Sequence, residues 1–190
     1  MTTMQVNYTL ECEGLACPMP VVRTKKAMEE LKTGEILEVR ATDKGSVADL
    51  QSWSKRTGHP YIGLKEENGV FRHFIRKSDP SEMKEVTKYP HTISNEELGN
   101  KLTAGEQVNI VDVREPAEYA FGRIPGAKSI PLGELEQRLH ELDPAKEYVF
   151  VCRTGNRSDL ACQTLADKGF KKVKNAIQGM TEWSGAVEQD

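Results

Sequence analysis

The chain has 190 residues, of which 37% are hydrophobic and 29% charged, and its formal net charge is −3. This composition is that of an ordinary globular protein, and the small negative charge gives no general attraction to nucleic acid or anionic membranes. The first residues lack the basic and apolar regions of a secretory signal, and no apolar run approaches the about 18 residues of a membrane span. The sequence therefore favours a cytoplasmic protein with no nucleic-acid or membrane partner.

The chain contains four cysteines, which are Cys12, Cys17, Cys152 and Cys162. They are too few for a disulfide scaffold of this length, and in a reducing cytosol we expect them to be thiols. No Cys or His pair follows at the spacing of a structural zinc site, so we predict no metal and no other cofactor.

A polar segment of mixed charge, bracketed by Pro80 and Pro90, breaks the periodicity of the chain. Such a segment is typical of a linker. We therefore predict a first domain over residues 1–78, a linker over 79–90 and a second domain over 91–190. Both domains are long enough to fold independently.

The first domain alternates strand and helix patterns. Its predicted elements are a strand over 8–12, a helix over 18–32, a strand over 36–41, a helix that Ser46 caps and Gly58 ends, and strands over 61–65 and 70–75. Asn68-Gly69 between the last two strands is a strong hairpin signal. The order βαβαββ predicts a two-layer α/β sandwich.

The second domain begins with Ser94 and Glu97, a capping box for a helix through Leu102. Short apolar runs over 109–113 and 148–151 predict buried strands, and a helix is predicted over 157–168. Strands that alternate with helices indicate a parallel sheet covered on both faces. Ligands of such sheets bind beyond the carboxyl ends of the strands, and Cys152 directly follows one strand.

Cys152 opens a loop that joins a buried strand to the start of a helix, Cys152-Arg153-Thr154-Gly155-Asn156-Arg157. The N–H groups and dipole of a helix start stabilise an anion, so we expect the pKa of this thiol to be lowered. Arg153 and Arg157 strengthen the effect, and Gly155 allows tight curvature. The plain alternative is a buried, inert cysteine at a strand end. Two flanking arginines favour the reactive thiol.

The stretch from about 91 to 185 resembles a single-domain rhodanese. The matching features are Asp112-Val113-Arg114-Glu115, Gly122-Arg123-Ile124-Pro125-Gly126-Ala127, Ile130-Pro131, the Cys152 loop, and Gly179 and Gly185 around Trp183. The resemblance implies that Cys152 accepts a sulfane sulfur as a persulfide, which the loop amides and Arg157 hold. It also implies that Asp112 and Arg114 brace the surrounding loops. Arg123 stands where the family commonly has His, which affects the charge of the pocket and the preference for a donor.

The length of the loop separates two kinds of chemistry. Four residues lie between Cys152 and Arg157. Related folds with phosphatase or arsenate reductase activity need one more residue, because a tetrahedral oxyanion is larger than a terminal sulfur. Phosphatase or arsenate reductase chemistry is therefore the weaker alternative. Cys162 lies on the apolar side of the following helix and is expected to belong to the core.

Cys17 lies immediately before the predicted first helix of the first domain, which opens with Pro18 and Pro20. The prolines remove N–H groups that would be unpaired there and stiffen the entry to the helix. We expect Cys17 to face the positive end of this helix, with basic side chains close in sequence. Those side chains are Arg23, Lys25 and Lys26. By itself, a Cys-Pro pair could simply mark a helix boundary.

Residues from about 6 to 77 resemble the TusA/SirA-like sulfur carriers. The matching features are the Cys-Pro-x-Pro motif at Cys17 to Pro20, Gly14-Leu15, Asp43, Trp53 and Gly58-His59. The resemblance implies that Cys17 is the carrier thiol. Cys12, at a strand end, is either core filler or a resolving thiol that forms a disulfide with Cys17. Glu11 stands where the family usually has Asp.

The two resemblances together suggest a sulfur relay. Our leading hypothesis is that Cys152 takes sulfur from thiosulfate or a low-molecular-weight persulfide and that Cys17 delivers it to an acceptor protein or thiol. The sequence leaves the direction of transfer open, so a partner protein could equally be the donor. The main alternative is a non-catalytic persulfide carrier that docks on a separate sulfur-using enzyme.

Overall fold

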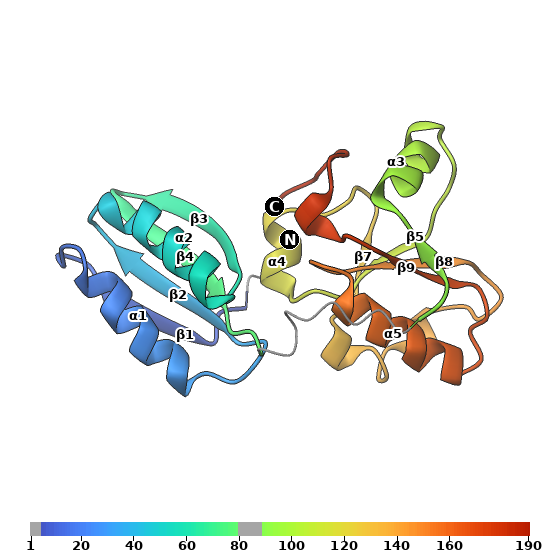
Figure 1. Cartoon of the computed structure of the whole chain (residues 1–190), viewed down its shortest axis with the longest axis horizontal. Helices are drawn as coiled ribbons and strands as arrows, with labels where there is room; N and C mark the ends of the chain where they lie inside the picture. Colours follow the sequence, from blue (N-terminus) through green and yellow to red (C-terminus); the bar gives the residue numbers. More distant parts are fainter. Residues whose placement is uncertain (1–4, 80–88) are drawn as a thin grey trace. The chain divides into compact units, whose positions relative to one another are not determined.

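The computed structural model describes residues 5–79 and 89–190, which form two compact units (Figure 1). Residues 80–88 of the predicted linker lie outside the described residues. Within the two described ranges, no helix has both the length and the apolar character needed to cross a bilayer.

The described residues of the first unit form six regular elements. They are β1 (Tyr8–Cys12), α1 (Met19–Glu30), β2 (Ile36–Ala41), α2 (Gly45–Thr57), β3 (Tyr61–Glu67) and β4 (Val70–Arg76). The sheet order is β1-β2-β4-β3, with β1 parallel to β2 and the other pairs antiparallel. Both helices pack on this sheet and on each other, as Figure 1 shows. The predicted two-layer βαβαββ sandwich is confirmed.

Local residues explain where these elements end. Gly58 ends α2 in the left-handed conformation at φ 79°, and its N–H donates to the carbonyl of Ser54. Asn68 and Gly69 both have positive φ, as the tight β3–β4 turn requires. The prediction that Ser46 caps α2 is wrong. The helix begins at Gly45 with Lys44 as its N-cap residue, and the Ser46 hydroxyl donates back to the Asp43 carbonyl at 2.6 Å.

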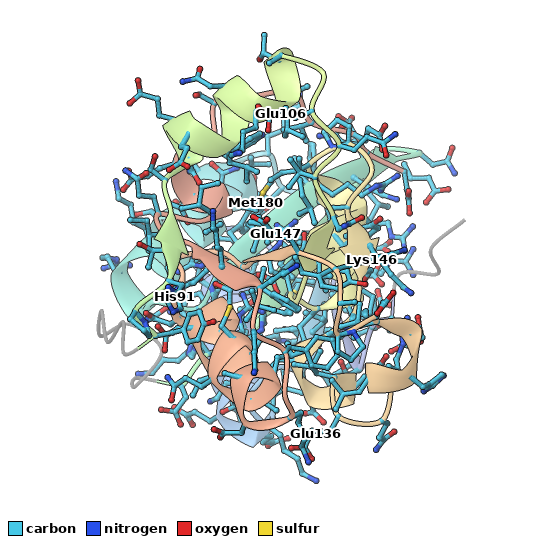
Figure 2. The ribbon with its side chains drawn as sticks, turned by 90° about the vertical axis from the view of Figure 1, so that its right-hand side faces the viewer. His91, Glu106, Glu136, Lys146, Glu147 and Met180 are labelled. Atoms are coloured by element: carbon cyan, nitrogen blue, oxygen red, sulfur yellow. The ribbon has the colours of Figure 1, made fainter. Side chains whose placement is uncertain are left out.

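The second unit is built on a five-stranded sheet. Its elements are β5 (Thr92–Ile93), α3 (Asn95–Thr103), β6 (Ile110–Asp112), α4 (Pro116–Phe121), β7 (Lys128–Ser129), β8 (Tyr148–Val151), α5 (Asn156–Asp167), β9 (Val173–Ala176) and the 3₁₀ turns η2 (Leu132–Glu134), η3 (Leu139–Glu141) and η4 (Met180–Glu182). The order is β5-β9-β8-β6-β7, and every pairing is parallel. His91, labelled in Figure 2, precedes β5, and its carbonyl accepts a hydrogen bond from the Asn175 amide.

Apolar side chains cover both faces of this sheet, as predicted. Tyr148 and Phe150 of β8 belong to a core cluster that includes Leu165 of α5. Val149 and Val151, which alternate with them, belong to a second cluster with Leu98 of α3. Ser94 caps α3 by accepting a hydrogen bond from the Glu97 amide at 3.1 Å, so the predicted helix start is confirmed. The sheet therefore presents the carboxyl end of β8, and with it Cys152, between two covered faces.

Candidate functional site

Cys152 follows β8 directly and is only 1% exposed. The loop after it turns back so that the Gly155 N–H donates to the Cys152 Sγ at 3.1 Å. Gly155 adopts φ 100°, a left-handed conformation that favours glycine over other residues. The loop therefore aims at least one backbone donor at the sulfur, an arrangement that stabilises a negative charge there.

Two polar residues that sequence reasoning missed complete the surroundings of the sulfur. The Ser158 hydroxyl lies 3.2 Å from the Cys152 Sγ and 2.6 Å from the Asn175 Oδ1. The Asn175 side chain donates in turn to the Gly155 carbonyl at 3.0 Å. Ser158 and Asn175 are both fully buried, so this network is a fixed part of the loop. Asn175 lies in β9, whose sequence Val-Lys-Asn-Ala is only half apolar, so no sequence pattern pointed to it.

The segment after β9 forms hydrogen bonds with the backbone at the start of the Cys152 loop. The Met180 amide donates to the Cys152 carbonyl at 2.8 Å, and both the amide and the hydroxyl of Thr181 donate to the Arg153 carbonyl. Gly179 approaches so closely that a Cβ atom there would lie 2.5 Å from the Arg153 carbonyl oxygen. Only glycine allows this contact, so the backbone around Cys152 is held from both sides.

Arg157 does not stand free at the loop. Its guanidinium forms a two-bonded ion pair with Glu118 of α4, at 2.8 and 2.9 Å, and both side chains are almost completely buried. The resemblance assigned to Arg157 the binding of a persulfide anion. The described contacts instead direct its hydrogen bonds to Glu118, which ties the first turn of α5 to α4. Sequence reasoning did not identify Glu118.

The predicted supporting residues lie around the same end of the sheet. Asp112 and Arg114 form a buried pair at 2.6 Å, and Arg114 also donates to the Gly122 carbonyl at 2.6 Å. This geometry fits the bracing role that the resemblance implied. Arg123 pairs with Asp190 at 2.8 Å and lies over the Tyr119 ring, so its charge faces the C-terminal residues.

The remaining predicted loop residues differ in exposure. Thr154 is exposed, whereas Arg153 and Asn156 are half-buried. A cleft of about 750 Å³ lies between α3 and η4, where Asn95 and Trp183 contribute to its wall. No residue from 152 to 157 lines this cleft.

Cys17 contrasts with Cys152 because its side chain is exposed. Pro18 is the N-cap residue of α1, and Pro20 is buried in the first turn. The Cys17 amide donates to the Asp43 Oδ2 at 3.0 Å, and the Gly45 amide donates to the Oδ1 at 3.2 Å. The Asp43 carboxylate is therefore held beside the cysteine by two backbone bonds.

The electrostatic surroundings of Cys17 are the reverse of the prediction. The side chain of Asp49 raises the pKa of Cys17, and the negative charge of Asp43 adds to the effect. The nearby basic residue Arg23 instead donates to the Glu11 carbonyl at 3.4 Å. The expectation of a thiol activated by basic neighbours is therefore wrong. Tertiary packing of α2 against the start of α1 brings acidic groups there.

The other two cysteines belong to the core. Cys12 and Cys162 are fully buried, and burial raises the pKa of each thiol. Cys12 packs with Met28 and Val39 in the first unit, which favours the interpretation as core filler. Among the described residues, no cluster of His, Cys, Asp or Glu side chains is arranged to hold a metal ion.

Comparison with known proteins identifies both units. The family model described as "Sulfurtransferase TusA" matches residues 8–77, and the one described as "Rhodanese-like domain" matches residues 94–186. YrkF of Bacillus subtilis, described as a candidate sulfur carrier protein, is 46% identical over 185 residues, which cover 97% of this chain and all of that protein. A candidate sulfur carrier of Aquifex aeolicus is 34% identical over 99% of this chain and 92% of its own length.

Other relatives match one unit each. The sulfur carrier protein TusA of Allochromatium vinosum is 44% identical over 72 residues, or 38% of this chain and 95% of that protein. The crystal structure of a rhodanese-like domain protein from Staphylococcus aureus covers 53% of this chain and 98% of its own, with 35% identity and a TM-score of 0.50. The chain thus belongs to the sulfur carrier and sulfurtransferase family in which a TusA domain precedes a rhodanese-like domain.

Proposed function

We propose that this protein is a sulfurtransferase that receives sulfane sulfur on Cys152 as a persulfide and passes it through Cys17 to a thiol acceptor. The proposed donors are thiosulfate and low-molecular-weight thiol persulfides. Both thiols are proposed to bear sulfur in turn, and the chain requires no cofactor for this chemistry.

The observation that carries the proposal is the hydrogen bonding of the Cys152 sulfur. It accepts from the Gly155 amide at 3.1 Å and lies within 3.2 Å of the Ser158 hydroxyl. The Gly155 amide stabilises a sulfur that carries negative charge, both as the attacking thiolate and as the persulfide, while the single Ser158 proton is directed to the Asn175 Oδ1 at 2.6 Å. Burial of Cys152 also shields a persulfide from stray thiols, because exchange depends on access.

The proposed first step is attack by the Cys152 thiolate on the sulfane sulfur of the donor. A bond forms between that sulfur and the Cys152 Sγ, and the bond to the rest of the donor breaks. The electron pair leaves on sulfite when the donor is thiosulfate, or on a thiolate when the donor is a persulfide. The sulfane sulfur keeps its oxidation state, so no external oxidant or reductant is needed.

Cys17 is suited to the second step because its side chain is exposed and can reach a partner. Its thiolate attacks the outer sulfur of the Cys152 persulfide, and the electron pair of the broken S–S bond returns to the Cys152 Sγ. Since both thiols belong to one chain, we expect this transfer to be intramolecular. Its rate should therefore not depend on protein concentration.

Intact-protein and peptide mass spectrometry after exposure to thiosulfate tests the relay. We expect a persulfide on Cys152 in the wild type and in Cys17→Ser. Cys17 should be labelled in the wild type but not in Cys152→Ser. Equal labelling of Cys17 in Cys152→Ser would overturn the proposed direction. Thiosulfate:cyanide turnover should be lost in Cys152→Ser and retained in Cys17→Ser.

A second candidate is a carrier without turnover. It is favoured by the descriptions of YrkF and the Aquifex aeolicus relative, which refer to sulfur carriers. Such a carrier would be persulfidated in proportion to the protein present and would not release sulfite or thiocyanate repeatedly. Multiple turnovers per protein molecule would support the sulfurtransferase and exclude a carrier without turnover.

A further inference from the structure

The cleft between α3 and η4 is a cavity that the proposed sulfur chemistry does not use. Its volume of about 750 Å³ is typical of small-molecule sites. Most of its wall comes from α3 on one side and from residues 178–186 on the other. Met180, labelled in Figure 2, begins η4 within that second segment. The cleft is therefore large enough for a small molecule and separate from the Cys152 loop.

Asn95 places a buried hydrogen-bond acceptor without a partner in the wall of this cleft. The residue is only 8% exposed, and its Nδ2 donates to the Gly179 carbonyl at 2.9 Å. This bond fixes the orientation of the side-chain amide. The Oδ1 on its other side has no hydrogen-bond partner among the described residues. Because a buried acceptor without a donor is costly, a ligand that brings an N–H group to Asn95 would be stabilised there.

Trp183 is the aromatic part of the same wall. Its ring lies against Gly185, where an added Cβ atom would come within 2.5 Å of the ring, and close to Gly99, where the distance would be 3.9 Å. The indole Nε1 donates to the Ala186 carbonyl at 3.0 Å. These contacts hold the half-buried ring in one place. It therefore offers a fixed π surface, and such a surface attracts a cation.

The charged side chains in the wall are acidic. They are Glu96 of α3 and Glu182 of η4, which come from opposite sides of the cleft. Within residues 5–79 and 89–190, no Lys, Arg or His lines the cleft, and the neighbouring Lys101 pairs instead with Glu106 at 3.1 Å. Two carboxylates without a basic partner disfavour an anion such as thiosulfate or sulfite and favour a cation.

We propose that this cleft is a binding site for a small organic cation that carries N–H donors, a guanidinium or ammonium group on an apolar stem. The charged group faces the Trp183 ring and the carboxylates of Glu96 and Glu182, and one of its N–H groups pairs with the Asn95 Oδ1. The site goes beyond the proposed sulfur transfer, because the side chains that define it lie outside the Cys152 loop.

A ligand in this cleft also acts on the backbone that holds Cys152. Asn95 donates to the Gly179 carbonyl, and the first two amides of η4 donate to the carbonyls of Cys152 and Arg153. A ligand that contacts both α3 and residues 178–186 stabilises the arrangement in which these hydrogen bonds are formed. We therefore expect hydrogen exchange of these two amides to slow about tenfold when the ligand is present at ten times its Kd.

Titration of the isotope-labelled full chain with butylguanidinium chloride, followed by NMR, tests the site in the unaltered protein. The chain has two tryptophans, and Trp53, in the core of the first unit, is the internal reference. We expect a saturable shift of the Trp183 indole N–H signal and none of the Trp53 signal. Butyltrimethylammonium has the same charge and stem but no N–H group, so it should bind at least about threefold more weakly. Butanoate should not bind. Absence of a saturable Trp183 shift with butylguanidinium, or equal affinity for the two cations, would overturn the proposal.

Charge variants test the two carboxylates with the same probe. Glu96→Gln and Glu182→Gln should each weaken binding of butylguanidinium about two- to fivefold, the range of an exposed ion pair. Glu97→Gln is the matched control, because Glu97 is an exposed acid of the same helix turn that does not line the cleft. Equal affinities in all three variants would overturn the proposal, and unchanged exchange of the η4 amides would overturn the action on the Cys152 backbone. None of these measurements involves a persulfide, so their outcome is independent of the proposed function.

Discussion

Gly179 lies where a side chain would collide with the backbone that carries Cys152. An added Cβ would lie 2.5 Å from the Arg153 carbonyl oxygen and 2.6 Å from the Cys152 carbonyl oxygen. Real Cβ atoms do not approach backbone atoms so closely, and a carbonyl cannot swing away as a flexible side chain can. Gly179 also has φ 60° and ψ −164°, a region that is used almost only by glycine.

These two effects set the size of the penalty for Gly179→Ala. The disallowed backbone costs about 1–3 kcal/mol, and forcing a methyl group into a filled space costs about 1–3 kcal/mol more. We expect a loss of about 2–6 kcal/mol in the free energy of unfolding of the second unit. For a unit of this size, each kcal/mol lowers the Tm by about 4–8 °C, so the decrease should be about 8 °C or more.

Gly126→Ala is the matched control. Gly126 has φ 79°, but a Cβ there would meet nothing within 4 Å. It should lose only the about 1–2 kcal/mol of a left-handed L-residue. Thermal unfolding compares the two variants, and persulfidation of Cys152 is measured at a temperature where both are folded.

The structure predicts that Gly179→Ala reduces persulfidation as well as stability. Relief of the contact must move the carbonyls of Cys152 and Arg153, which accept hydrogen bonds from Met180 and Thr181. A Gly179→Ala protein that is no less stable than Gly126→Ala and accepts sulfur normally would refute the reasoning.

Three further outcomes are expected. Glu118→Gln leaves the buried Arg157 charge unpaired and should cost about 3–5 kcal/mol in urea unfolding, whereas a loss below about 1 kcal/mol would mean that the pair behaves like a surface pair. Ser158→Ala should cost about 1–3 kcal/mol and slow persulfidation of Cys152, because the buried Asn175 Oδ1 loses its donor and Asn175 holds the Gly155 carbonyl of the loop; an unchanged rate in peptide mapping would contradict this. Burial lowers the pKa of His73 from 6.5 to about 4, so the first unit should keep its stability above pH 6.5 and lose it as the pH falls towards 4. His73→Gln should flatten that part of the Tm profile, and an equally steep profile in the variant would count against the assignment.

The fold could be predicted from sequence because its signals are local. Gly58 and the Asn68-Gly69 pair mark chain reversals through the positive φ that each adopts, and Ser94 caps α3 through the Glu97 amide. Short elements were not predicted, because strands of two residues and the six-residue α4 show no measurable periodicity. The Ser46 cap failed because the hydroxyl has a tertiary partner, the imidazole of His73, at 3.1 Å.

The proposed site could be predicted only where a motif carries it. Cys152 and Gly155 are only three residues apart in the sequence, so the loop that they form could be recognised there. Ser158, Asn175 and Glu118 reach the loop from α5, β9 and α4, and their partners follow from strand order and helix packing. A sequence pattern gives no distance between such elements. These residues can therefore be identified only from the three-dimensional structure.

Cys17 shows the same limit of sequence-based prediction, and here the limit concerns the chemical surroundings of a thiol. Cys17 and Cys152 both precede a helix, and from sequence both are expected to be activated by the helix start and by basic neighbours. Packing separates them, because the carboxylate of Asp43 is held beside Cys17, whereas the Gly155 amide donates to the Cys152 sulfur and Ser158 and Asn175 fix the loop around it. The same local motif thus lies in two different tertiary surroundings, which the sequence alone does not distinguish.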